Sequence, residues 1–171
     1  MDILKNRIRE IPDWPEKGVS FKDITPLLMH PPAFQMAVDR LVDEFDAASI
    51  DKVAAIDARG FLIGALVAYF LDAGLVLVRK QGKLPPPTIA ESYELEYGQN
   101  TLEIRKDSVL PEERVLVVDD VLATGGTAAA TAELIRKAGG LVAGFGFLLE
   151  LSDLNGRHKL QGEHIVSLLL Y

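Results

Sequence analysis

Two adjacent carboxylates followed by a Thr-Gly-Gly-Thr turn are the strongest chemical signal in the sequence. Asp119 and Asp120 come directly after an apolar run at residues 115–118. In open α/β sheets, ligands bind beyond the carboxyl ends of the strands. A helix that begins with glycines offers free backbone N–H groups and the positive end of its dipole, which suits a phosphate. Thr124 and Thr127 add hydroxyl donors, and the carboxylates can accept hydrogen bonds from ribose hydroxyls or hold waters on Mg²⁺.

A plainer interpretation of this turn has Thr127 capping a helix and the two aspartates exposed to solvent. Two carboxylates and two threonines at one strand end favour a binding site over that alternative. The turn is not a Walker A loop, because no Lys-Ser or Lys-Thr pair follows the glycines. His30, His158 and His164 have no metal-ligand spacing, and the chain has no Gly-x-Ser-x-Gly nucleophile elbow.

Apolar runs that alternate with helical stretches must position this turn. The pattern predicts strands at residues 53–56, 75–78, 115–118, 141–151 and 165–170, and helices at residues 33–45, 61–71 and 127–138. Apolar strands separated by helices indicate an α/β fold with a mainly parallel, twisted sheet flanked by helices. Nearer the N-terminus, residues 4–11 have helix-like spacing and residues 15–25 are predicted to be an irregular loop.

The composition narrows the classes of protein. The 171 residues suffice for a single domain, 49% of them are hydrophobic, and there is no cysteine for a disulfide or a thiolate site. The net charge of −7 argues against nucleic acid or an acidic membrane as a partner. Without a membrane-length apolar run or the apolar stretch of a secretion signal, the sequence predicts a cytoplasmic protein.

One segment interrupts the alternation of strands and helices. Residues 81–97 contain three consecutive prolines, several charges and two tyrosines, with little apolar periodicity. Loops this long are uncommon in compact domains unless they are functional or disordered. The segment is therefore either a lid over an active site or a flexible insertion.

Residues 115–127 resemble the phosphoribosyl pyrophosphate signature of the type I phosphoribosyltransferases. The resemblance implies that Asp119 and Asp120 contact the ribose hydroxyls. It also implies that a loop wraps the 5′-phosphate, and this loop consists of Ala123, Thr124, Gly125, Gly126 and Thr127. The signature identifies the phosphoribosyl donor but not the acceptor base, and some relatives that carry it are regulators.

Four further segments resemble the adenine-specific members of that family. They are residues 15–27, 57–61, 78–85 and 92–98. With the donor signature they extend in order over most of the chain, from residue 11 to about residue 151. The implied fold is the type I phosphoribosyltransferase fold over residues 1–171, with an N-terminal base-binding hood at about residues 1–32 and a flexible catalytic loop at residues 80–98.

For adenine, the resemblance implies stacking of Phe21 on one face of the base and packing of Leu151 on the other. Backbone groups of Val19 and Lys22 are expected to read the base edge. The family often has arginine where this chain has Lys22, so a contact that needs the planar guanidinium is not expected here. Both apolar side chains could instead be ordinary core residues.

For pyrophosphate, the resemblance implies five contact residues: Ala58, Arg59, Arg79, Lys80 and Lys83. Lys80 is expected to reach the site of a neighbouring subunit, since these enzymes are homodimers. The plainer alternative for these cations is a solvated basic surface.

For catalysis, the resemblance implies that Glu96 and Tyr97 close over the reacting centre, assisted by Arg59. As a separate hypothesis, Glu96 manages the purine proton or orients the base as charge shifts. The expected reaction joins adenine to phosphoribosyl pyrophosphate and gives AMP and pyrophosphate. Mg²⁺ is carried by the donor, with Asp119 and Asp120 nearby. The alternatives are another purine as acceptor, or a regulator that senses phosphoribosyl pyrophosphate on the same fold.

Overall fold

A computed structural model describes residues 3–94 and 99–171 of the chain. It divides into two compact units, Met1–Arg40 and Leu41–Tyr171. The predicted hood falls within the first unit, and its role in binding the base remains a prediction. Within the described ranges, no helix combines the length and the apolar character needed to cross a bilayer.

The first unit contains a β-hairpin where a helix and a loop were predicted. Only the 3₁₀ turn η1 (Lys5–Arg7) is helical, and β1 (Arg9–Pro12) pairs antiparallel with β2 (Ser20–Asp23). The prediction was wrong because so short an isolated helix is marginal in water, whereas the hairpin pairs the same backbone groups. Two helices follow: the short α1 (Thr25–Leu28) and α2 (Pro31–Phe45), whose end belongs to the second unit.

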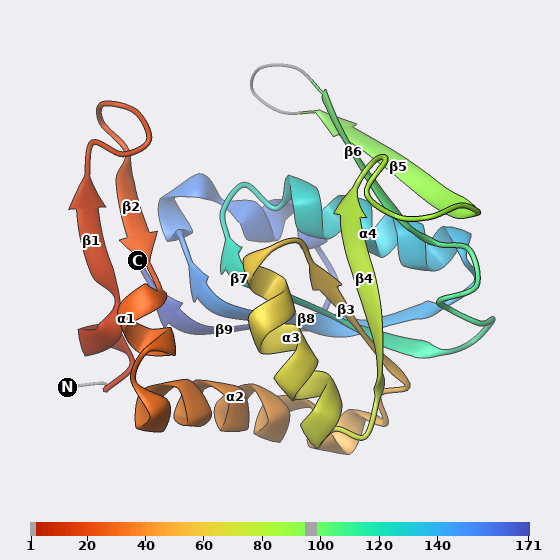
Figure 1. The fold of residues 1–171 in the computed structure, drawn as a ribbon, viewed down its shortest axis with the longest axis horizontal. Helices are drawn as coiled ribbons and strands as arrows, with labels where there is room; N and C mark the ends of the chain where they lie inside the picture. The colour runs from red at the N-terminus through yellow and green to blue at the C-terminus, as the bar shows by residue number, and fades with distance from the viewer. Residues whose placement is uncertain (1–2, 95–98) are drawn as a thin grey trace. The chain divides into compact units, whose positions relative to one another are not determined.

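The second unit is built on a seven-stranded sheet (Figure 1). The strand order is β5-β6-β4-β3-β7-β8-β9, and the five strands from β4 to β9 in this order run parallel. Their bounds are β3 Lys52–Ile56, β4 Gly74–Lys80, β5 Thr88–Glu94, β6 Gln99–Arg105, β7 Arg114–Leu122, β8 Leu141–Glu150 and β9 Ile165–Leu170. The remaining elements are α3 (Arg59–Phe70), α4 (Gly126–Lys137) and the 3₁₀ turns η2 (Asp46–Ala48), η3 (Ser152–Leu154) and η4 (Gly156–Leu160). The predicted mainly parallel sheet is confirmed.

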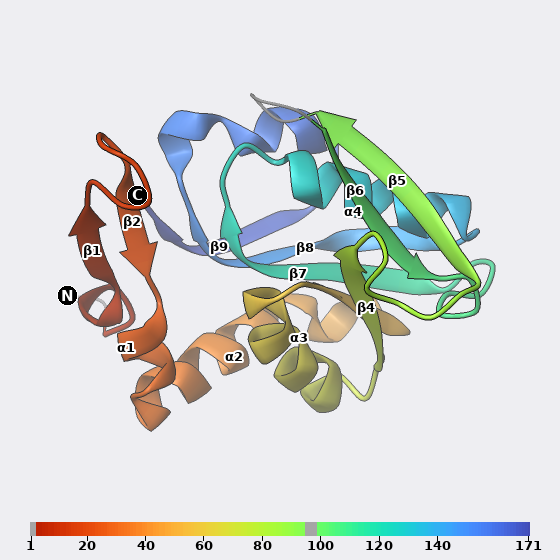
Figure 2. The ribbon, with the colours of Figure 1, turned by 45° about the horizontal axis from the view of Figure 1, so that its top comes forward.

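Helices α3 and α4 cover opposite faces of this sheet (Figures 1 and 2). Successive side chains of a strand point to opposite faces. Ala55 of β3 lies under α3, where a Cβ added to Gly64 would come 2.6 Å from the Ala55 Cβ. Its neighbours Ala54 and Ile56 belong to the buried cluster that includes Ala128 of α4. Both faces are therefore covered, which explains why the central strands are continuously apolar.

The segment predicted as a long loop contains an edge strand. Strand β5 pairs antiparallel with β6 from Thr88↔Arg105 to Glu94↔Gln99, so only part of residues 81–97 is a loop. Ile89 and Tyr93 pack against the core while alternate residues are exposed. An antiparallel edge strand needs only one apolar face, which is why its polar residues concealed it. The lid function remains a prediction, and Glu96 and Tyr97 lie outside the described residues.

Candidate functional site

The predicted phosphate loop joins the end of β7 to the start of α4. Gly125 precedes the helix with φ 77°, a left-handed conformation that favours glycine. A Cβ at Gly125 would also lie 2.3 Å from the carbonyl oxygen of Gly156 in η4. The loop lines a small cavity of about 70 Å³ together with Asp119 and Phe147. A glycine-led helix start at a strand end therefore has the geometry predicted for a phosphate site.

The two carboxylates lie at the end of β7, beside this loop. Asp119 Oδ1 accepts a hydrogen bond of 2.8 Å from the backbone N–H of Asp120. Burial raises the pKa of Asp119, and the neighbouring Asp120 carboxylate raises it further. Burial also raises the pKa of Asp120, an effect that the Arg59 guanidinium opposes. A positive charge or hydroxyl donors placed beside the two carboxylates would therefore stabilise their ionised forms.

Arg59, at the start of α3, forms an ion pair with Asp120. Its Nε lies 2.8 Å from Asp120 Oδ2, a buried oxygen that accepts no hydrogen bond within the described part of the chain. Gly60 permits this approach, because a Cβ there would come 2.8 Å from Asp119 Oδ1. The preceding Asp57–Ala58 peptide is cis. The turn after β3 and the end of β7 therefore meet at one edge of the sheet.

A cavity of about 190 Å³ collects residues from both predicted sets. Its lining includes Ala58, Arg59, Lys80, Asp119, Asp120 and Thr127. These residues come from the ends of three neighbouring parallel strands, β4, β3 and β7, and from the helices that follow two of them. The structure thus brings together the predicted pyrophosphate and ribose residues within one chain.

Arg79 and Lys83 belong to a hydrogen-bonded network beside this cavity. Arg79 Nε donates to Asp57 Oδ2 at 2.9 Å, and its Nη1 donates to the carbonyl oxygen of Lys83 at 3.1 Å. Glu103 of β6 is buried and accepts from the backbone N–H groups of Lys83 and Leu84, both at 3.0 Å. The roles of Asp57 and Glu103 were not predicted. Asp57 stood in the segment that signalled Arg59, whereas Glu103 gave no sequence signal.

The predicted adenine residues of the first unit lie on β2 and in the turn before it. The Phe21 ring meets Trp14 edge to face, with 4.4 Å between the ring centroids. Lys22 Nζ forms an ion pair of 2.9 Å with Glu10. The N–H of Val19 donates to the Glu16 carbonyl oxygen at 3.1 Å, and its carbonyl oxygen accepts from Trp14 at 3.2 Å. A base that accepts from the Val19 N–H must therefore replace one turn hydrogen bond, whereas the carbonyl oxygen has a second lone pair.

Leu151, the fourth predicted adenine residue, lies in the second unit directly after β8. It is half-buried, and its N–H donates to the carbonyl oxygen of Leu122 at 2.9 Å. This bond places Leu151 at the carboxyl end of the sheet, next to the end of β7. Its position is thus compatible with a ligand that occupies the donor site.

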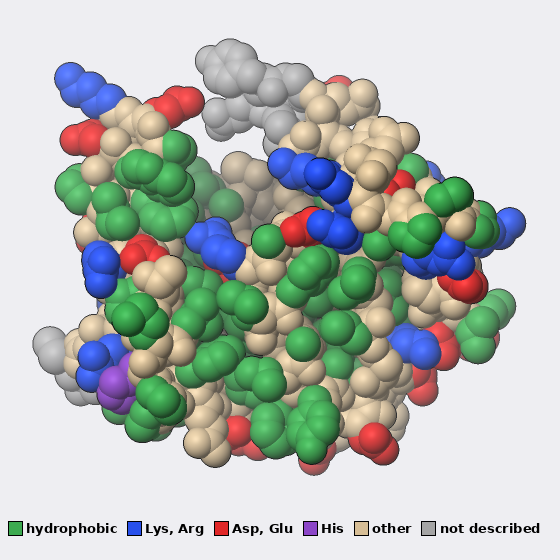
Figure 3. All heavy atoms as spheres, viewed as in Figure 1, with side chains coloured by type: hydrophobic (Ala, Val, Ile, Leu, Met, Phe, Trp, Pro, Cys, Tyr) green, Lys and Arg blue, Asp and Glu red, His purple; other side chains and the backbone are tan. Residues whose placement is uncertain are grey.

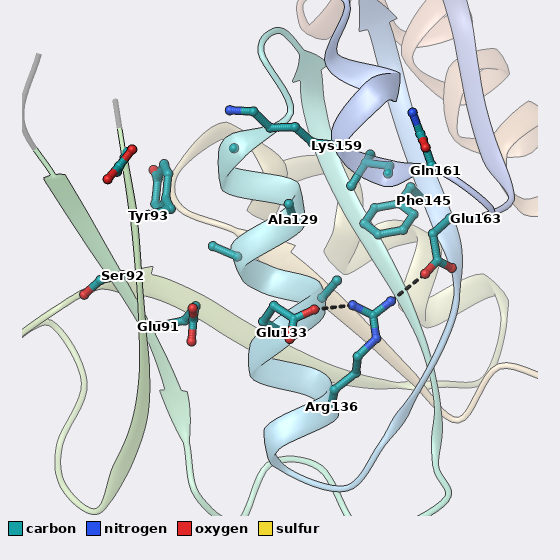
Figure 4. Close-up of a pocket in the computed structure, with 15 residues that line it drawn as sticks. Glu91, Ser92, Tyr93, Ala129, Glu133, Arg136, Phe145, Lys159, Gln161 and Glu163 are labelled. Atoms are coloured by element: carbon teal, nitrogen blue, oxygen red, sulfur yellow. Dashed lines mark hydrogen bonds and ion pairs between the residues drawn. The ribbon is translucent and has the colours of Figure 1, made fainter. Parts of the chain in front are cut away.

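A larger cavity of about 420 Å³ runs along α4 (Figure 4). Strand β5 contributes Tyr93 on one side, and η4 contributes Lys159 on the other. Lys159 Nζ would lie 3.6 Å from a Cβ at Gly126, so its ammonium group is beside the phosphate loop. Arg136 at the other end is paired with Glu133 and Glu163. The predicted phosphate, ribose and pyrophosphate residues line the two smaller cavities. We therefore place the candidate site in these two cavities, although the cavity along α4 is larger.

Comparisons with known proteins identify the family and the fold of the chain. The Phosphoribosyl transferase domain family matches residues 28–163. The chain is 52% identical over 171 residues to an adenine phosphoribosyltransferase of Geobacter metallireducens, which covers 100% of both chains. A crystal structure of adenine phosphoribosyltransferase from Thermoanaerobacter pseudethanolicus superposes with a TM-score of 0.95, at 51% identity and with 98% of each chain covered.

A more distant structure carries ligands. It is the adenine phosphoribosyltransferase of Saccharomyces cerevisiae in complex with adenine and D-2,5-dideoxy-2,5-imino-altritol 1,6-bisphosphate. Its TM-score is 0.91 at 36% identity, with 97% of this chain and 96% of that chain covered. The chain therefore belongs to the adenine phosphoribosyltransferases of the phosphoribosyl transferase domain family, and it has their type I fold.

Proposed function

We propose that this chain is an adenine phosphoribosyltransferase of purine salvage, which converts adenine and phosphoribosyl pyrophosphate to AMP and pyrophosphate. One observation carries the proposal. The phosphate loop, the Asp119–Asp120 pair and the cations Arg59 and Lys80 surround adjoining cavities at the carboxyl edge of one sheet. The yeast relative was solved with adenine, which supports adenine as the acceptor.

The reaction asks the protein for positioning and for charge stabilisation. A purine nitrogen bonds to C1 of the ribose while the C1–O bond to pyrophosphate breaks, and its electron pair leaves with pyrophosphate. Positive charge develops on the sugar, and Asp119 and Asp120 stabilise it from the end of β7. Loop residues 123–127 hold the 5′-phosphate through backbone N–H groups and threonine hydroxyls. Both ends of the donor are thereby fixed about the reacting carbon.

Cations at the ends of β3 and β4 stabilise the leaving group. Arg59 and Lys80 line the cavity, and Arg79 is held by a hydrogen bond to Asp57, which also lines it. The Ala58 backbone and Lys83 complete the proposed pyrophosphate site. Arg59 is paired with Asp120 through Nε, and a guanidinium has five N–H donors, so it can bind the ligand's oxygens while it stays paired.

Adenine is proposed to stack on Phe21 and to pack against Leu151, with its edge read by the backbone of Val19 and Lys22. These residues belong to different units of the chain, and Phe21 is partly exposed on its hairpin. Glu96 and Tyr97 are proposed to close over the reacting centre. Glu96 then accepts or holds the purine proton while water is excluded.

The carboxylates fit a magnesium ion that arrives with the donor. Within the described residues, no group of three or more His, Cys, Asp or Glu side chains forms a metal cage. The buried Asp120 Oδ2, although ion-paired with Arg59, accepts no hydrogen bond within the described residues and has a lone pair for metal-bound water. Asp119 and Asp120 would hold the waters of a donor-bound Mg²⁺, which would supply charge neutralisation to the leaving group.

The active form is proposed to be a cytoplasmic homodimer in which Lys80 contributes to a neighbouring site. A stripe of exposed apolar side chains supports such an interface. Leu62, Tyr69 and Phe70 project from α3, and Leu75 and Leu77 project from the adjacent β4. Figure 3 shows hydrophobic side chains gathered over this face of the second unit. An exposed apolar patch of this kind is usually buried in a symmetric contact between two subunits.

A purine panel tests the proposed function. The protein is incubated with Mg²⁺, phosphoribosyl pyrophosphate and adenine, hypoxanthine, guanine or xanthine, and nucleotide and pyrophosphate are quantified. AMP and pyrophosphate formed in equal amounts from adenine alone are the expected result. Product from another base would leave the donor site intact and overturn the adenine site. Tight donor binding without product from any base would instead indicate a regulator.

A further inference from the structure

Tyr93 of β5 contacts the phosphate loop, and the expected site residues did not include it. Its hydroxyl oxygen lies 3.1 Å from Thr127 Oγ1, within hydrogen-bond distance. Two ring carbons would lie 3.1 and 3.4 Å from a Cβ at Gly126, so the ring packs against the bare backbone of that glycine. Tyr93 also lines both the 190 Å³ cavity and the 420 Å³ cavity along α4, where its side chain faces the helix (Figure 4).

A bound phosphate that accepts from Thr127 fixes which of the two hydroxyls, Tyr93 or Thr127, donates to the other. A hydroxyl has one donor hydrogen and two acceptor lone pairs. If Thr127 donates its hydrogen to a phosphate oxygen, its Oγ1 can only accept from Tyr93. The tyrosine hydroxyl must then be the donor, which leaves the threonine hydrogen directed at the ligand.

Helical threonines have a competing partner for that hydrogen. One turn further along α4, Thr131 Oγ1 donates a hydrogen bond of 2.9 Å to the carbonyl oxygen of Thr127. Thr127 occupies the first turn of the same helix, so its hydroxyl could likewise turn toward the backbone. A hydrogen bond donated to Thr127 Oγ1 from outside the helix would oppose that rotation.

We propose that Tyr93 is a positioning residue for the 5′-phosphate: its hydroxyl donates to Thr127 Oγ1 and orients the Thr127 hydrogen toward the ligand. The inference rests on the proposed function of residues 123–127 as the phosphate loop. It makes β5, which lies within the predicted catalytic loop at residues 80–98, a structural partner of the occupied phosphate loop. Recognition of the 5′-phosphate therefore extends beyond the loop itself.

The test compares ligands that contain a 5′-phosphate with one that does not. In Tyr93→Phe, which keeps the ring on Gly126, calorimetry should show roughly tenfold weaker binding of ribose 5-phosphate, the effect of about one neutral hydrogen bond. Pyrophosphate affinity should stay within about twofold. The KM for phosphoribosyl pyrophosphate should rise by the same tenfold while kcat at saturation and the KM for adenine change little.

A double-mutant cycle separates positioning from general support. Thr127→Val removes the threonine hydroxyl at nearly constant shape, and adding Tyr93→Phe to it should weaken ribose 5-phosphate binding no further. Ser108→Ala removes one hydroxyl hydrogen bond, to the Arg105 carbonyl oxygen in the turn before β7; it is the control and should bind both ligands normally. Thermal melts of each variant show whether the fold is retained.

The possible failures are distinct. Unchanged ribose 5-phosphate binding in Tyr93→Phe, or an equal loss for pyrophosphate, would overturn the inference and leave the proposed function standing. A full additional loss in the Thr127→Val background would also overturn it, because Tyr93 would then act without Thr127. If the unaltered protein binds no ribose 5-phosphate, the phosphate loop and the inference are both overturned.

Discussion

Arg59 Nε lies 2.8 Å from Asp120 Oδ2, so a cation predicted for the pyrophosphate is paired with a carboxylate predicted for the ribose. The carboxylate is buried whereas the arginine side chain is 42% exposed. Solvent around the arginine therefore screens the attraction and reduces the free energy that the pair contributes to folding. The pair also links the turn after β3 to the end of β7, across neighbouring parallel strands.

Arg59→Met should destabilise the protein in a pH-dependent way. Burial raises the Asp120 pKa and Arg59 opposes this, so removing Arg59 raises that pKa further. The stability that the pair contributes exists only while Asp120 is ionised, and it disappears as the pH falls and Asp120 is protonated. We expect a loss of about 1–2 kcal/mol at pH 8 that shrinks toward pH 5, measured by denaturant unfolding. Arg136→Met removes exposed pairs and serves as the control; an equal loss at both pH values would refute the explanation.

Asp119→Asn should make the protein more stable and less active. The folded-state pKa of Asp119 is raised, so this group contributes stability that is fully present below its unfolded pKa and lost as the pH rises through the folded pKa. At pH 8 the ionised carboxylate is therefore unfavourable, and asparagine removes that penalty while its Oδ1 still accepts from the Asp120 N–H. The melting temperature should rise by a few degrees at pH 8 and hardly at pH 4. Turnover should fall about 100-fold because the sugar's positive charge loses a partner; a lower melting temperature at pH 8 would contradict the argument.

Gly125→Ala should disable the phosphate loop. Its φ of 77° disfavours a side chain, and the new Cβ would also meet the Gly156 carbonyl oxygen at 2.3 Å. Gly162 has φ 83° with nothing within 4 Å, so Gly162→Ala reports the backbone strain alone, about 1 kcal/mol. We expect Gly125→Ala to lose clearly more stability than this control and more than tenfold in affinity for ribose 5-phosphate. Equal behaviour of the two variants would mean that the contact with Gly156 is unimportant.

The local parts of the site could be predicted from sequence, and the parts that depend on strand neighbours could not. Asp119, Asp120 and residues 123–127 are contiguous, so their types and order define the loop before any fold is known. Asp57 and Arg79 are 22 residues apart, and they meet only because β3 and β4 are parallel neighbours. Gly156 supports the phosphate loop from η4, in a polar segment whose composition indicated no function.

The errors in the fold prediction have the same origin. Residues 4–11 carry helix-like spacing, yet their pairing with β2 decides their structure. Strand β5 follows three prolines and has mixed polarity, and its identity depends on β6, which the sequence pattern did not reveal. Patterns along the chain report burial, whereas strand pairing is a property of two segments at once.

Glu103→Ala should weaken pyrophosphate binding from a position without ligand contact. The buried carboxylate accepts the N–H groups of Lys83 and Leu84 and thereby fixes the turn that carries Lys83. Truncation leaves two donors without their acceptor, so pyrophosphate affinity measured by calorimetry should fall about tenfold while ribose 5-phosphate affinity is kept. Glu103→Gln retains an acceptor oxygen and should recover most of the binding. A Gln variant as weak as the Ala variant would show that the charge, and not the hydrogen bonding, matters.

Subunit complementation decides which chain supplies Lys80 to a given site. Lys80 lines the cavity of its own chain together with Asp119, whereas the family resemblance predicts that it acts across a dimer interface. Lys80→Met and Asp119→Asn should each be nearly inactive alone. If Lys80 acts on the neighbouring site, a mixed dimer regains one intact site, which contains Asp119 of the first variant and Lys80 of the second.

Random reassociation of equal amounts should then restore about a quarter of the original activity, because half of the dimers are mixed and half of their sites are intact. Co-expression with two different affinity tags isolates the mixed dimer, in which half of the activity is expected. If Lys80 acts within its own chain, both sites of the mixed dimer carry one defect and no activity returns. That result would assign Lys80 to the cavity that it lines in the single chain, and would leave the apolar stripe of α3 and β4 as the remaining support for the dimer.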